Sequence, residues 1–75
     1  MPKITLVRNP VNTSMNRLGT DALNAMSQLD HSDDVTLELE TEIEATITFS
    51  WNGIQPFEGN IDDHLFKYGL KVKQI

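Results

Sequence analysis

Carboxylates are the side chains of this sequence with the most potential for chemistry. Between positions 30 and 44 there are seven of them and no Lys or Arg. They are Asp30, Asp33, Asp34, Glu38, Glu40, Glu42 and Glu44. Paired carboxylates catalyse acid–base reactions when their surroundings differ, whereas four glutamates at every second position share one kind of surroundings. The pattern therefore favours the binding of a cationic partner over catalysis.

The other reactive side chains lack the sequence context that catalysis needs. His31 and His64 have no partner at a metal-binding spacing such as HExxH, and none of the four serines lies in a nucleophile-elbow sequence. The absence of Cys excludes disulfides, thiolate metal sites and a Cys nucleophile. We expect a protein that is not an enzyme and that has no metal and no cofactor.

The glutamates belong to segment 35–51, in which apolar and polar side chains alternate. Eight of its nine odd positions are apolar, and none of its even positions is. A period of two is typical of a strand with one face in a core and the other in water. On such a strand the four glutamates would share the outer face about 7 Å apart, and each adjacent pair would repel by roughly 0.6 kcal/mol. We therefore expect these charges either to be neutralised or to serve a function.

Segment 35–51 is too long to lie straight within one small protomer. Its length as a strand is about 58 Å, whereas a compact chain of 75 residues has a radius of gyration of about 11 Å. Three arrangements remain open: a hairpin, a strand bent at a bulge, and a long strand that pairs with a second copy. A three-residue loop over 40–42 would keep the odd positions inward on both arms, but Glu and Thr suit the positive φ of such a loop poorly.

The flanking segments predict two helices and further short strands. Before segment 35–51 we expect a strand at 3–8 and a helix that starts after Thr13 or Ser14, or at Thr20, and runs to Leu29. After it we expect an Asn52–Gly53 turn with a brief return strand and a helix at 61–68 that is capped by Asn60 and ended by Gly69. The last expected element is a strand at 70–75. The fold class is α+β, a single domain over 1–75 with two short helices on one face of a small antiparallel or mixed sheet. If the long segment is two strands, the order is that of a split βαβ sandwich.

The composition of the chain limits which classes of partner we expect it to bind and in which cellular compartment we expect it. Eleven acidic and six basic residues give a net charge of −5, which argues against direct nucleic-acid binding because phosphates need cations. No apolar run approaches a membrane span, and residues 1–9 lack the core of a signal peptide. We therefore expect a soluble, cytoplasmic protein that binds no membrane. A chain this short buries a marginal core, which favours a homodimer.

Two interpretations of the glutamates remain open. In the first, Lys3, Lys71 and Lys73 neutralise them across the sheet, or their charges keep a strand edge from aggregating. The protein is then a structural homo-oligomeric module whose acidic stripe serves only solubility. In the second, the carboxylates form an exposed anionic surface for a basic partner protein.

The second interpretation gives the predicted function, a small acidic protein-binding domain that acts as an inhibitor or adaptor. Because a row of carboxylates can present charge as a phosphate backbone does, the basic partner would include nucleic-acid-binding proteins. A viral protein, such as a phage-type inhibitor that mimics nucleic acid against a host enzyme, would fit this pattern. Trp51 is either a core residue under the second helix or an aromatic anchor. The predicted partner-binding residues are Glu38, Glu40, Glu42, Glu44, Asp33, Asp34 and Trp51.

Overall fold

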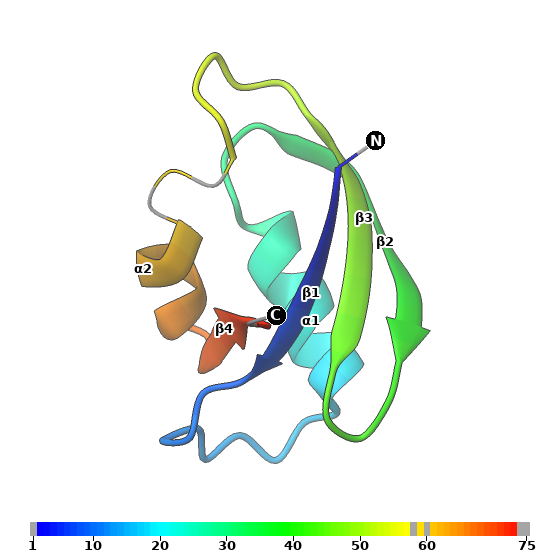
Figure 1. The fold of residues 1–75 in the computed structure, drawn as a ribbon, viewed down its shortest axis with the longest axis vertical. Helices are drawn as coiled ribbons and strands as arrows, with labels where there is room; N and C mark the ends of the chain where they lie inside the picture. Colours follow the sequence, from blue (N-terminus) through cyan, green and yellow to red (C-terminus); the bar gives the residue numbers. More distant parts are fainter. Residues whose placement is uncertain (1, 58, 60, 74–75) are drawn as a thin grey trace.

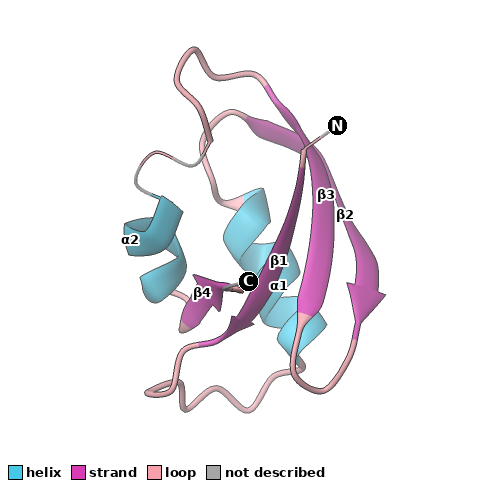
Figure 2. Cartoon of the chain, viewed as in Figure 1, coloured by secondary structure: helices cyan, strands magenta, loops and turns pink. Residues whose placement is uncertain are grey.

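Four antiparallel strands and two helices make up the part of the chain that the computed structural model describes, residues 2–57, 59 and 61–73. The elements in chain order are β1 (Lys3–Arg8), α1 (Leu18–Ser27), β2 (Ser32–Glu40), β3 (Ala45–Trp51), α2 (Ile61–Phe66) and β4 (Leu70–Val72). The sheet order is β2-β3-β1-β4, and all neighbouring strands run antiparallel (Figures 1 and 2). The predicted α+β class, with an antiparallel sheet and two helices, is confirmed.

The long alternating segment is a hairpin within one chain. Glu40 pairs with Ala45, and residues 41–44 form the loop, in which the Thr41 backbone N–H donates to the Glu44 carbonyl at 2.8 Å. An even-numbered loop exchanges the two faces of the returning strand, because side chains alternate with a period of two. A register shift between Leu37 and Leu39 restores the inward face, so that Leu37 lies opposite Ile47. The hairpin and the bulge are therefore both present.

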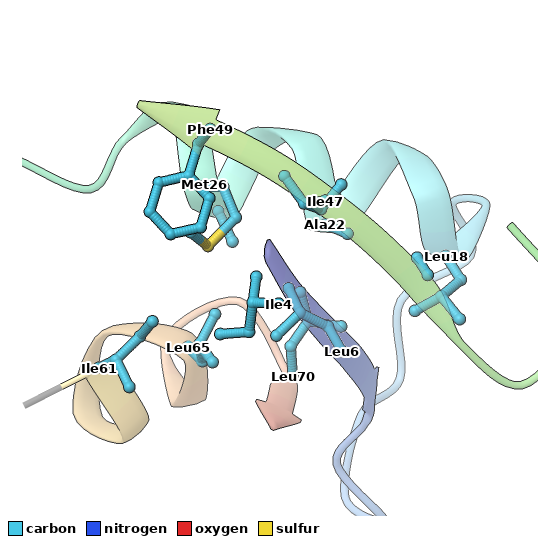
Figure 3. Packing of buried hydrophobic residues seen from close by; sticks show 12 residues of the cluster. Ile4, Leu6, Leu18, Ala22, Met26, Ile47, Phe49, Ile61, Leu65 and Leu70 are labelled. Atoms are coloured by element: carbon cyan, nitrogen blue, oxygen red, sulfur yellow. The ribbon is translucent and has the colours of Figure 1, made fainter. Parts of the chain in front are cut away.

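The core lies between the sheet and the two helices. β1 and β3 bury alternate side chains as predicted, among them Ile4 and Leu6 of β1 and Ile47 and Phe49 of β3. Figure 3 shows these side chains meeting those of α1 on one side and of α2 and β4 on the other. The fully or nearly fully buried apolar residues are Ile4, Leu6, Leu18, Ala22, Ala25, Met26, Ala45, Ile47, Phe49, Ile61, Leu65 and Leu70.

Both helices end earlier than the sequence suggests, α1 at Ser27 and α2 at Phe66. α1 begins at Leu18, after an extended Arg17 that makes no side-chain cap, so neither predicted start is correct. α2 ends at Phe66 in turns that lead to Gly69, whose φ of 72° is the left-handed conformation predicted for it. The predicted cap Asn60 and the end of the predicted last strand, residues 74–75, lie outside the described residues.

The predicted hairpin turn at Asn52–Gly53 is wrong. A type I′ turn requires positive φ at both central residues, but of the described glycines only Gly69 has one. Residues 52–57 contain no strand. Instead, the loop folds back over Trp51, whose indole N–H donates to the Gln55 carbonyl at 2.7 Å.

A partly buried ion pair joins the end of β1 to α1. The Arg8 guanidinium donates to the Asp21 carboxylate at 2.9 Å, and the Asn16 amide donates to the other Asp21 oxygen at 3.1 Å. Asp21 is 7% exposed. Burial by itself raises the pKa of Asp21, but hydrogen bonds from Arg8, Ser14 and Asn16 and the charge of Arg8 hold that pKa below its ordinary value. The pair fixes the connector between β1 and α1.

Candidate functional site

The four glutamates do not share one face of a strand, and the predicted acidic stripe is wrong. Glu38 is the extra residue of the β2 bulge and Glu40 follows the bulge, while Glu42 and Glu44 lie in the hairpin loop. A bulge adds one residue to a strand and so changes which side chains point to each face. The apolar Leu39 is consequently 52% exposed. Strict alternation in the sequence could not reveal this change.

Glu40 points toward the core side and caps α1. One of its carboxylate oxygens accepts a hydrogen bond from the Gly19 backbone N–H at 2.6 Å, and the other accepts one from Arg17 at 2.5 Å. Its side chain is only 18% exposed. The first N–H groups of a helix need acceptors, and here the acceptor comes from a distant strand. Glu40 therefore has a structural role that the sequence did not indicate.

Two of the remaining glutamates are paired with lysines. Lys3 lies 3.2 Å from the Glu38 carboxylate, and Lys73 lies 2.6 Å from that of Glu44. Lys3 and Lys73 are two of the three lysines that the first interpretation of the glutamates places across the sheet from them. Pairs of this kind are exposed and add little stability, but they cancel the local negative charge. The hairpin end of the sheet is therefore largely neutralised.

The predicted residues Asp33, Asp34 and Trp51 gather at the opposite end of the hairpin. Ser32 pairs with Trp51, and Asp33 pairs with Ser50. The Asn52 backbone N–H donates to the His31 carbonyl at 2.8 Å, and the Asn52 side-chain amide donates to the Asp33 carboxylate. In Figure 1 this end lies at the top, away from the β2–β3 loop. The structure thus joins three of the seven predicted residues and separates them from the four glutamates.

Positive φ angles shape the strand at this end. His31 has a φ of 70°, and Asp34 has a φ of 52° at a second register shift of β2. Asp is one of the few residues other than Gly that adopts this conformation at low cost. The backbone therefore turns sharply on either side of Ser32 and Asp33. Ser32 holds the turn by donating to the Met26 and Leu29 carbonyls at 2.6 and 2.8 Å.

A cavity of about 500 Å³ lies beside Trp51. Leu29, Ile54 and Pro56 contribute apolar surface to it, and Asp30 and His31 contribute polar groups. Ile54 is fully exposed. The volume falls within the range of about 300 to 1,000 Å³ that is common for ligand pockets. Of its lining residues only Trp51 was predicted as a site residue, and the signal available in the sequence was the loop 52–57 directly after it.

The Trp51 indole is held in a fixed orientation. The His31 ring meets it edge-on at 6.0 Å, and Phe57 packs against it at 6.3 Å. Gly53 lies so close that a Cβ atom there would be 2.8 Å from Cε2 of the indole. Trp51 is half-buried and packs against the core. Trp51 therefore packs against the core and also lines the cavity, and its role as a partner-facing anchor stays a prediction.

Asp30 lines the cavity, and neither it nor Asp33 and Asp34 of neighbouring β2 forms an ion pair within the part of the chain that the structure describes. All six Lys and Arg side chains belong to the described residues, and four of them pair elsewhere, with Glu38, Asp21, Glu40 and Glu44. Among the described residues, no ion pair reaches Asp30, Asp33 or Asp34, and all three are exposed. Of the three hairpin acids without an ion pair among the described residues, Asp33 and Asp34 lie at the Trp51 end and Glu42 lies in the loop.

Comparison with family models, curated proteins and solved structures finds no match to this chain. Within the described ranges, no group of three His, Asp or Glu side chains could hold a metal ion, and no helix is long and apolar enough to span a membrane.

His64 has a structural contact, since its Nε2 donates to the Ala25 carbonyl at 2.6 Å and so joins α2 to α1. That the protein is not an enzyme stays a prediction.

Proposed function

We propose that this protein binds a basic partner protein through the Trp51 surface, which consists of Asp30, His31, Asp33, Asp34, Trp51 and Ile54. The observation that carries the proposal is the coincidence of an apolar cavity with unpaired carboxylates. Asp30, which lines the cavity, and Asp33 and Asp34, which lie in neighbouring β2, have no ion pair among the described residues, whereas Glu38, Glu40 and Glu44 each have one. The proposed role is that of an inhibitor or adaptor without catalytic activity.

The Trp51 surface combines two features of protein interfaces. Energetically dominant interface residues are enriched in Trp and lie near the centre of a contact, surrounded by residues that exclude water. Trp51 is already fixed by Gln55, His31 and Phe57, so little conformational entropy is lost when a partner covers it. The exposed charges of Asp30, Asp33 and Asp34 would speed the approach of a basic partner, because exposed charges act mainly on the association rate.

This proposal moves the contact away from the glutamates. A mimic of nucleic acid needs a row of unpaired charges, and the paired glutamates near the hairpin loop offer no such row. We therefore still propose a basic partner, but we no longer propose that the glutamates mimic a phosphate backbone. It gives Glu38, Glu40 and Glu44 structural roles and assigns partner binding to Asp33, Asp34 and Trp51.

A structural homo-oligomeric module is the second candidate function. The Lys3–Glu38 and Lys73–Glu44 pairs favour it, because neutralised charges no longer keep two copies apart. Leu39 and Ile43 are 52% and 74% exposed near the same end of the hairpin, where contact between copies would bury them. Light scattering separates the candidates: a stable dimer that dissociates when Leu39 and Ile43 are replaced by Ser supports the module.

The test of the proposed function compares two triple variants that each remove three negative charges. The first replaces Asp30, Asp33 and Asp34 by Asn. The control replaces Glu42, Asp62 and Asp63 by the corresponding amides, since these exposed acids do not line the cavity beside Trp51 and have no ion pair among the described residues. Affinity capture from the cells that encode the protein, followed by mass spectrometry, identifies proteins retained by the unmodified chain.

The expected result is a partner that the unmodified chain and the control retain and that the Asp30/Asp33/Asp34 variant loses. With the purified partner, the loss should lie mainly in the association rate and should shrink as salt rises above about 150 mM, where the screening length is about 8 Å. Equal retention by both triple variants at about 50 mM salt would contradict the proposal, because Asp30, Asp33 and Asp34 would then contribute no more to binding than acids elsewhere in the chain.

A further inference from the structure

The geometry points to an arginine side chain of the partner as the occupant of the cavity beside Trp51, an inference that rests on the proposed function. The hydrogen-bonding groups that line the cavity differ in whether they already have a partner. The indole N–H of Trp51 already donates to the Gln55 carbonyl, and the Asn52 side-chain amide donates to Asp33. The Asp30 carboxylate, in contrast, is exposed at the cavity and can only accept. The cavity therefore favours an occupant that brings donors and positive charge.

The walls of the cavity determine the shape of that occupant. Leu29, Trp51 and Pro56 offer apolar surface, which suits an aliphatic stem. A charged side chain can bury such a stem along apolar surface while its head stays at the polar rim. Asp30 would meet the head, while the stem would lie along the apolar walls. Lysine and arginine both have this form.

The Trp51 ring favours arginine over lysine. A cation held over the face of a Trp ring is attracted by the ring quadrupole, and this contact is more often made by Arg. The planar guanidinium also stacks on aromatic faces and pairs with a carboxylate through two parallel hydrogen bonds, which an ammonium group cannot do. Since Gly53 and Gln55 fix the indole, its position is already set before the ligand arrives.

The test uses the fluorescence of Trp51, the single Trp of the chain, and four short probe peptides. Acetyl-Gly-Arg-Gly-amide is titrated beside peptides in which lysine, citrulline or norleucine replaces arginine. Citrulline keeps the shape without the charge, and norleucine keeps only the aliphatic stem. The expected Kd of the arginine peptide is on the order of 1 mM, with binding about three- to fivefold weaker for citrulline and weaker still for norleucine.

Two protein variants test whether the effect of charge on peptide binding arises at the cavity. Asp30→Asn should weaken the arginine peptide about fivefold and leave the norleucine peptide unchanged. Glu42→Gln, which removes one exposed charge at the hairpin loop, should leave both unchanged. Far-UV circular dichroism verifies that each variant is folded, and the NMR signal of the Trp51 indole N–H verifies that the peptide binds beside the ring.

Several outcomes would overturn the arginine assignment. Equal binding of norleucine and arginine would make the cavity a site for an aliphatic side chain, and equal binding of citrulline would remove the role of charge. Stronger binding of lysine, an equal effect of Glu42→Gln, or no saturable signal up to about 10 mM would also exclude it.

The arginine assignment and the proposed function can fail separately. If no peptide binds but the Asp30/Asp33/Asp34 variant still loses its partner protein, the assignment is wrong and the proposed function stands. If the arginine peptide binds but partner capture does not depend on these aspartates, the cavity accepts arginine and the proposed function is wrong.

Discussion

The Glu40 carboxylate accepts a hydrogen bond at 2.6 Å from the backbone N–H of Gly19, and this contact joins the edge strand of the sheet to the first turn of α1. Gly19 has a reason to lack a side chain at this position. A Cβ atom there would lie 2.8 Å from both the Glu40 carboxyl carbon and a methyl group of Leu37. Gly19 therefore lowers the helix propensity of α1, but its missing side chain leaves room for Glu40, which caps the helix.

We predict that Gly19→Ala destabilises the protein, although Ala is the better helix former by about 1 kcal/mol. Overpacking against Glu40 and Leu37 should cost about 1 to 3 kcal/mol, so the net effect is a loss. Urea unfolding measures it. Thr20→Ala is the matched control, because Thr20 is exposed one position further along α1 and should be neutral or stabilising. A more stable Gly19→Ala variant would show that Glu40 does not approach α1 closely.

A second prediction separates Glu40 from the other glutamates. Glu40→Ala removes the acceptor for the Gly19 N–H and the partner of Arg17, and should lower the free energy of unfolding by about 1 to 2 kcal/mol, as loss of a helix cap does. Glu42→Ala should leave stability unchanged, because Glu42 is exposed in the loop and has no ion pair among the described residues. Equal unfolding midpoints for the two variants would contradict the capping role.

The third prediction concerns acid stability. The pKa of Asp21 is lowered in the folded protein, so its carboxylate stabilises the fold above its unfolded pKa. This contribution should be lost as the pH falls below about 4 and the group takes up a proton. Asp21→Asn should cost about 1 to 3 kcal/mol at pH 7 by weakening the bonds to Arg8 and Asn16. The difference from the unmodified chain should shrink at about pH 3, as chemical unfolding at the two pH values would show.

Asp63→Asn is the control for this experiment. Asp63 is exposed in the first turn of α2 and has no ion pair among the described residues. Its replacement should change stability less than Asp21→Asn at pH 7. An Asp21→Asn variant that matched it at both pH values would show that the Arg8–Asp21 pair does not stabilise the fold.

The fourth prediction concerns the two glycines of the loop after β3. A Cβ at Gly53 would meet the Trp51 indole at 2.5 Å, whereas one at Gly59 would meet only the Pro56 carbonyl oxygen at 3.4 Å. Gly53→Ala should therefore displace the indole, shift Trp51 fluorescence emission and alter the cavity. Gly59→Ala should leave the emission spectrum unchanged. Identical spectra for both variants would show that Gly53 does not fix the ring.

The sequence by itself determined the elements whose signals are local. Alternation placed Ile4 and Leu6 of β1 and the odd positions of β3 in the core, because a period of two assigns faces wherever the strand is regular. The left-handed Gly69 followed from its position after an amphipathic segment. The charge count and the absence of Cys likewise needed no structure.

Only the tertiary structure decided which carboxylates are paired and which are free. The register of the hairpin brings Asp33 opposite Ser50 and places His31 beside Trp51, 20 positions away in the chain. The bulge in β2 turns Glu40 toward α1, where the unsatisfied N–H of Gly19 needs an acceptor. A one-residue shift reverses the face of every following side chain, and contacts with distant elements decide where that shift occurs. Periodicity within one segment carries no record of those contacts, which is why the sequence predicted a continuous acidic stripe and the structure has an acidic surface at Trp51.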